Sequence, residues 1–104
     1  MTQDKLKQIR AKHTRSLYLG EHPPEIVLQQ KIELLKACIK QASESLEEYR
    51  TFIDWYMTIE GFSVAVVLTI THKEHVTACE IEKFNSDLEE LYEDAKIMRV
   101  EVDA

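Results

Sequence analysis

The chain has 104 residues, of which 44% are hydrophobic and 31% are charged, and its formal net charge at pH 7 is −6. This composition is typical of one soluble globular domain, and the acidity argues against a general nucleic-acid-binding protein. No apolar run approaches the roughly 20 residues that cross a bilayer, and the polar start predicts no secretory signal. We therefore expect a single cytoplasmic domain over residues 1–104.

Residues 1–20 predict a short basic helix. Leu6, Ile9, His13 and Leu17 recur on one helical face, and a glycine follows as a suitable stop. Residues 1–23 carry a net charge of +3, so this helix suits either an anionic ligand or the acidic remainder of the chain.

A small anionic ligand or a nucleotide is thus an alternative binding hypothesis for this segment. Basic side chains hold phosphate by charge, and an aromatic ring can stack on a base. The candidate residues are Lys5, Lys7, Arg10, Lys12, Arg15 and Tyr18. We favour the simpler interpretation, in which the helix packs on the acidic hairpin of its own or a second chain.

Residues 24–60 predict a long helix with the apolar spacing of a coiled coil. The apolar positions follow one another in alternating steps of four and three: Leu28, Ile32, Leu35, Ile39, Ala42, Leu46, Tyr49, Ile53 and Tyr56. Pro24 suits the first turn of the helix. A stripe of this kind buries only a narrow seam, so the helix must lie along another helix.

Residues 62–100 predict that second long helix, folded back at Gly61. Its own apolar series is Ile81, Phe84, Leu88, Leu91, Ala95 and Met98. Two of the expected pairings between the helices are poor: Leu46 with Thr77, and Tyr49 with Glu74. The two series align as an antiparallel pair. The expected fold is therefore all-α: a short N-terminal helix followed by a long, coiled-coil-like helical hairpin.

Residues 62–71 also support an α+β alternative. Apolar residues alternate along this segment as they do in a strand. We favour a helix, because Gly61 is a natural helix stop, Ser63 is a natural cap and the mirrored heptads need helix here.

Aromatic residues gather near the fold-back point, and four of them are our candidate partner-binding residues: Phe52, Trp55, Tyr56 and Phe62. A lone two-helix hairpin cannot cover all the apolar residues at this end. We therefore expect either a homo-oligomeric helical bundle or a surface that binds another protein.

The chain shows no motif for catalysis or cofactor binding. His72, His75 and Cys79 share one side of a helix, but no fourth ligand is evident, so we predict no metal site. The two glycines suit helix ends and form no phosphate-binding loop. We expect that the chain is not an enzyme, that it binds no cofactor and that the thiols of Cys38 and Cys79 are reduced.

These patterns predict a non-enzymatic interaction protein that acts by occupancy, as an adaptor, regulator or inhibitor of another macromolecule. Small phage and mobile-element inhibitors share this helical shape, which is an analogy of fold alone. The acids of the last helix would form a solvated face that adds charge complementarity: Glu80, Glu82, Asp87, Glu89, Glu90, Glu93 and Asp94.

Overall fold

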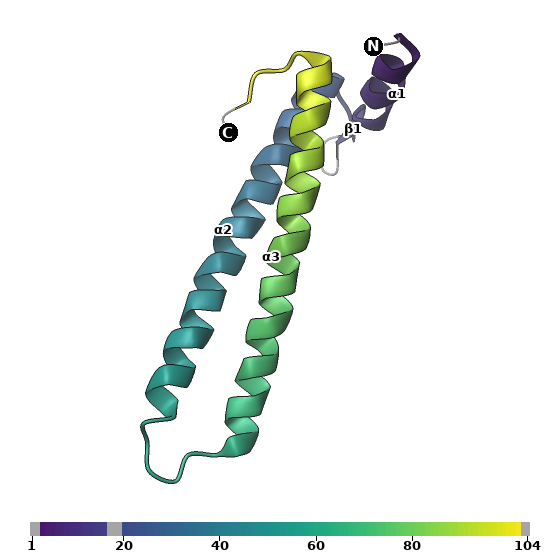
Figure 1. Cartoon of the computed structure of the whole chain (residues 1–104). Coiled ribbons are helices and arrows are strands. Elements are labelled where there is room, and N and C mark those ends of the chain that lie inside the picture. Colours follow the sequence, from purple (N-terminus) through teal and green to yellow (C-terminus); the bar gives the residue numbers. More distant parts are fainter. Residues whose placement is uncertain (1–2, 17–19, 103–104) are drawn as a thin grey trace. The chain divides into compact units, whose positions relative to one another are not determined.

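The computed structural model describes residues 3–16 and 20–102 (Figure 1). The elements in chain order are α1 (Gln3–Lys12), β1 (Arg15–Ser16), β2 (Gly20–Glu21), α2 (Pro24–Tyr56) and α3 (Val64–Met98). They belong to two compact units: the first unit, Met1–Lys36 with Ser86–Ala104, and the second unit, Ala37–Asn85. No stretch of the described helices is both long and apolar enough to cross a membrane.

The expected all-α fold with a helical hairpin is confirmed. In the second unit α2 and α3 lie side by side and antiparallel, joined by a short turn (Figure 1). Each of the nine heptad positions expected on α2, and each of those expected on α3, is buried or half-buried. Glu74 also faces this seam, where its carboxylate lies 3.5 Å from Arg50 Nε. The 3.5-residue repeat therefore identified the facing sides of both helices.

The segment that also suggested a strand is helical. α3 begins at Val64, and the carbonyl of Ser63 accepts the Val67 N–H at 3.2 Å. Ser63 thus stands at the N-cap position, as expected. The apolar alternation after Gly61 reflects a helix with apolar residues on several sides.

Two predicted helix ends are wrong. α1 ends at Lys12 instead of near residue 20, because the chain turns where Thr14 Oγ1 bonds the Ala11 carbonyl at 3.0 Å. β1 and β2 then pair antiparallel over two residues each. α2 ends at Tyr56 instead of Glu60, and Thr58 bonds the last turn through its N–H and its hydroxyl. Leu17, assigned to the first helix, lies outside the described residues.

The first unit has a core made by three helices. Its buried apolar cluster is Ile9, Leu28, Ile32, Ala95 and Met98. α1 contributes one of these side chains, α2 two and α3 two. The third helix lets seam residues such as Leu28 and Ile32 become almost fully enclosed.

The second unit has no such core. None of residues 37–85 is buried, and its seam side chains are only half-buried. Two helices cover only one side of each other, so the large apolar residues away from the seam stay in contact with solvent.

The end of α3 is closed by a Schellman motif. The Val100 N–H bonds the Ala95 carbonyl at 2.9 Å and the Arg99 N–H bonds the Lys96 carbonyl at 3.3 Å. Arg99 has φ 59°, a left-handed conformation that glycine adopts without strain. Val100 then packs against the buried cluster.

Arg99 and Gly61 both have positive φ, so replacing Arg99 by glycine and Gly61 by alanine should change the free energy of unfolding in opposite directions. We expect Arg99→Gly to raise the free energy of unfolding by about 0.5–1 kcal/mol, because it relieves backbone strain at a helix end. We expect Gly61→Ala to lower it by about 1 kcal/mol. Gly61 has φ 76° and open space where a Cβ would stand, so strain is its only cost. Urea denaturation measures both changes, and two shifts of the same sign would contradict this reasoning.

Candidate functional site

The four aromatic residues expected to bind a partner divide into two pairs. Tyr56 stacks on Phe52, with ring centroids 5.4 Å apart, and meets Phe62 edge-on at 6.2 Å. The Tyr56 hydroxyl also accepts the Ser63 N–H at 2.9 Å. Tyr56 and Phe62 are half-buried, so they secure the turn between α2 and α3. Tyr56 and Phe62 therefore stabilise the end of the hairpin and are not themselves the exposed part of the expected partner-binding surface.

Phe52 and Trp55 are the exposed pair. Their ring centroids lie 6.1 Å apart, and 59% of Trp55 is exposed. They line an open groove of about 630 Å³ on α2, which we call the acidic-aromatic groove: Glu44, Glu47, Glu48, Thr51, Phe52 and Trp55. Helical spacing puts these residues on the side of α2 opposite the seam. An exposed tryptophan beside a second ring is a typical interface anchor.

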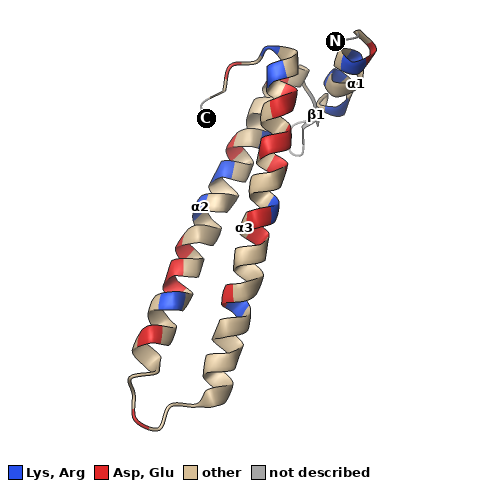
Figure 2. Cartoon of the chain, in the orientation of Figure 1, with Lys and Arg blue, Asp and Glu red and all other residues tan. Residues whose placement is uncertain are grey.

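A second apolar surface lies on α3, and we call it the uncharged face of α3: Val64, Leu68 and Thr71. Val64 is 62% exposed and Leu68 is 64% exposed. In Figure 2 the part of α3 next to the turn carries no charged residue. This face therefore offers apolar contact without charge.

The first unit contains a buried ionic network that the sequence analysis did not predict. His13 is 1% exposed, and its Nε2 lies 2.8 Å from Asp94 Oδ2. On the other side of the ring, Lys31 Nζ lies 3.0 Å from Nδ1. Lys12 Nζ adds an ion pair to Asp94 Oδ2 at 2.7 Å and a longer one to Glu90 at 3.6 Å. The network joins α1, α2 and α3 within this unit.

The hydrogen bonds assign the protons in this network. The Lys31 ammonium has only donors, so it donates to Nδ1 of His13, and the Nε2–H donates to Asp94. His13 is therefore neutral. Burial lowers the pKa of His13, and the charges of Lys31 and Lys12 lower it further, against the opposing effect of Asp94.

The other groups of the network shift in the directions that support it. The hydrogen bond to Asp94 raises the pKa of Lys12, and burial lowers the pKa of Lys31. Burial opposes ionisation of Asp94, but the hydrogen bonds from Lys12 and His13 outweigh it, so the pKa of Asp94 is lowered. Asp94 is thus a buried carboxylate with its charge compensated.

The expectation that Asp94 lies on a solvated acidic face is wrong. Asp94 is buried because α1 covers that side of α3, which a heptad pattern on the hairpin alone does not reveal. The signal for its partner was present, since His13 continues the apolar face of Leu6 and Ile9. A histidine at an apolar helix position requires a polar partner when it becomes buried.

The candidate anion-binding residues have different surroundings. Lys5 and Lys7 are exposed, Arg10 forms an ion pair with Glu25, and Lys12 forms ion pairs with Asp94 and Glu90. The side chain of Arg15 and all of Tyr18 lie outside the described residues. Two of the cations are therefore already bonded to carboxylates.

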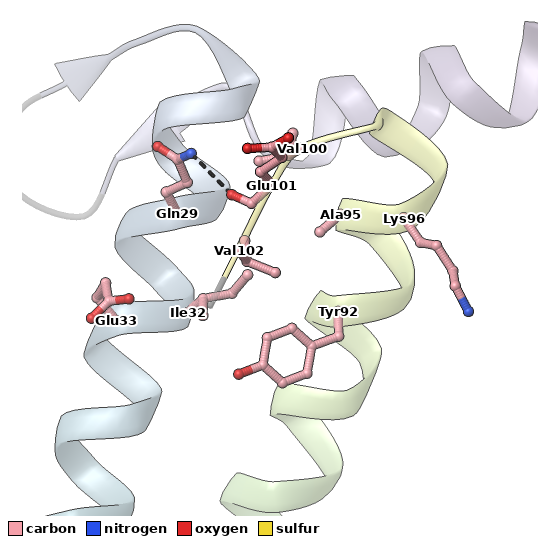
Figure 3. A pocket seen from close by; sticks show the side chains of 9 residues that line it. All are labelled: Gln29, Ile32, Glu33, Tyr92, Ala95, Lys96, Val100, Glu101 and Val102. Carbon is pink, nitrogen blue, oxygen red and sulfur yellow. Dashed lines mark hydrogen bonds between the residues drawn. The ribbon is translucent and has the colours of Figure 1, made fainter. Parts of the chain in front are cut away.

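A groove of about 760 Å³ in the first unit separates α2 and α3 beneath the segment that follows α3 (Figure 3). Val100 and Val102 pack against the buried cluster on one side of it. Gln29 Nε2 donates to the Glu101 carbonyl at 3.5 Å, which ties this segment to α2. The segment that follows α3 thus forms one wall of the groove.

The thiol and imidazoles considered for metal binding form only a pair contact. Cys79 Sγ lies 3.8 Å from His75 Nε2, one helical turn away. Among the described residues, no group of three or more acidic, histidine or cysteine side chains is arranged to hold a metal ion.

Comparison of the chain with protein-family models, with curated proteins and with solved structures finds no match.

The buried histidine predicts that acid destabilises the fold. An unfolded histidine has a pKa of about 6.5, and folded His13 has a lower one, so below about pH 6.5 the unfolded chain binds more protons. The free energy of unfolding should therefore fall as the pH decreases through this window. Urea denaturation at about pH 7.5 and about pH 5.5 measures the change.

Two variants isolate the contribution of His13. His13→Gln should cost about 1–3 kcal/mol at neutral pH, because it disrupts a buried hydrogen-bond network, and it should flatten the pH dependence. His72→Gln, at an exposed position on α3, is the matched control and should keep the full dependence. A pH dependence that survives His13→Gln would contradict the assignment.

Proposed function

We propose that this chain is a non-enzymatic interaction protein that acts by occupancy, as an adaptor, regulator or inhibitor of another macromolecule. It assembles with a second copy of itself and binds its partner through the second unit. One observation carries the proposal: no residue of the second unit is buried, although the unit exposes several large apolar side chains. Exposed apolar surface of this kind marks an interaction site.

The energetics of the exposed residues favour association. Leu68 and Val64 are each almost two-thirds exposed, so covering either side chain gains roughly 1–2 kcal/mol. A two-fold contact uses each gain twice, because both copies present the same surface. Two helical hairpins packed in this way form a four-helix bundle.

Charge selects which surface the second copy covers. The uncharged face of α3 can meet its own copy without repulsion. A two-fold contact over the acidic-aromatic groove would gather two copies of Glu44, Glu47 and Glu48 in one interface, which is unfavourable because all six charges are negative. We therefore place self-association on α3 and leave the outer side of α2 for another partner.

The polar groups of the first unit support a structural role. Every buried polar side-chain atom among the described residues has a hydrogen-bond partner. Asp94 bonds both His13 and Lys12, and His13 also bonds Lys31, so the hydrogen-bonding groups of the carboxylate and the imidazole are used within the unit. Catalysis needs a positioned group that is available to a substrate, so we assign this network a structural role.

Anionic-ligand binding by the first helix stays a prediction. The ion pairs of Arg10 and Lys12 reduce the positive charge that this site would offer, so we rank it below protein binding. A cytoplasmic location likewise stays a prediction.

A single charge on α3 tests self-association. Sedimentation of the wild-type chain at micromolar concentration should report a dimer or a larger assembly. The Leu68→Glu substitution should raise the dissociation constant of this self-assembly by about tenfold or more, because the new carboxylate would be buried in an apolar contact.

Leu34→Glu is the matched control, since Leu34 is an exposed leucine of α2 in the first unit, which has its own core. It should leave the assembly unchanged. A wild-type monomer, or equal dissociation by both variants, would contradict the proposal.

A further inference from the structure

The acidic-aromatic groove is shallow and open, because all of its lining residues lie on one helix, α2. Its six residues form two parallel rows with a spacing of four: Glu44, Glu48 and Phe52 in one row, and Glu47, Thr51 and Trp55 in the other. The channel between two such rows is where a ridge of another helix packs. The rows extend over about 17 Å at 1.5 Å per residue, which corresponds to about three helical turns.

The charge of the groove defines the chemistry of the partner. All six residues are exposed, and Glu44, Glu47 and Glu48 have no ion-pair partner among the residues that the structure describes. The second unit as a whole has eight carboxylates and four cations. Glu44 and Glu48 also repel each other one turn apart, a cost that a cationic partner relieves. Lysine or arginine therefore belongs beside these glutamates.

The apolar end of the groove specifies an amphipathic partner. Phe52 and Trp55 follow the glutamates directly, so positive charge and apolar surface must stand next to each other on the partner. The groove lies within α2, whose backbone groups are bonded along the helix, so strand addition is not available. The acidic surface excludes nucleic acid and anionic membranes as partners.

We propose that the acidic-aromatic groove binds a basic amphipathic helix of another protein, about three turns long. Its apolar ridge packs between the two rows against Phe52 and Trp55, and its lysines or arginines meet the glutamates. This inference rests on the proposed function, because it specifies the partner that the second unit binds.

A synthetic helix tests the proposal directly. The probe is a peptide of about 14 residues without tryptophan, with leucines along one ridge and lysines beside them. Trp55 is the only tryptophan of the chain, so its emission reports this groove. Titration of the full chain with this peptide should shift the Trp55 emission to the blue and saturate at one peptide per chain. The affinity for the peptide should fall as the salt concentration rises. The same peptide with glutamate in place of lysine should give no shift.

Variants locate the contact. Glu44→Gln with Glu48→Gln should weaken binding by about tenfold, and Phe52→Ala by a similar factor, in fluorescence anisotropy with a labelled peptide. The matched controls are Glu82→Gln, an exposed glutamate of α3, and Met57→Ala, an exposed apolar residue of the turn. Both should bind as the wild type does.

The inference would be overturned by the absence of a blue shift at any peptide concentration, or by equal weakening in the control variants. A peptide that binds equally well after prolines are placed in its centre would show that an extended segment, and no helix, occupies the groove. Failure of the peptide while the chain still assembles through Leu68 overturns this inference and leaves the proposed function intact. Loss of that assembly as well removes both.

Discussion

Two packed helices cannot enclose a side chain, and this limit governs the whole molecule. Where α1 adds a third layer, in the first unit, Leu28 and Ile32 become almost inaccessible to solvent. Where only α2 and α3 meet, in the second unit, even the seam residues remain half-exposed. The same heptad pattern therefore has different consequences along one pair of helices. The second unit is left with apolar surface that an intermolecular contact must cover.

The third layer depends on polar chemistry as well as on apolar packing. α1 contributes Ile9 to the core, but it is also fixed through His13 and Lys12, which both bond Asp94. A buried carboxylate destabilises the fold unless its charge is compensated, so removing one partner of Asp94 leaves a buried charge that is only partly compensated. This coupling makes docking of α1 sensitive to protonation of a single imidazole. The acid-sensitive part of the fold is therefore the first unit, which is also the unit with a buried core.

Much of the architecture was predictable, because apolar spacing along a helix depends only on local geometry. The seam from Leu28 to Tyr56, the turn at Gly61 and the cap at Ser63 follow from residue type and period. Burial of Asp94 did not, since it requires knowing that α1 returns to cover α3. Of the aromatic residues, spacing indicated that Phe52 and Trp55 lie off the seam. It did not indicate that Tyr56 secures the turn through the Ser63 N–H.

Amide hydrogen exchange at two protein concentrations tests most directly whether the second unit depends on an intermolecular contact. Exchange should be compared at about 0.05 µM, below the range in which assembly is expected, and at about 100 µM, with mass spectrometry assigning protection to peptides. We expect protection of residues 37–85 to rise with concentration, while that of the buried positions in residues 24–36 and 86–98 stays constant. Equal protection of residues 37–85 at both concentrations, in a chain that sediments as a monomer, would contradict the account.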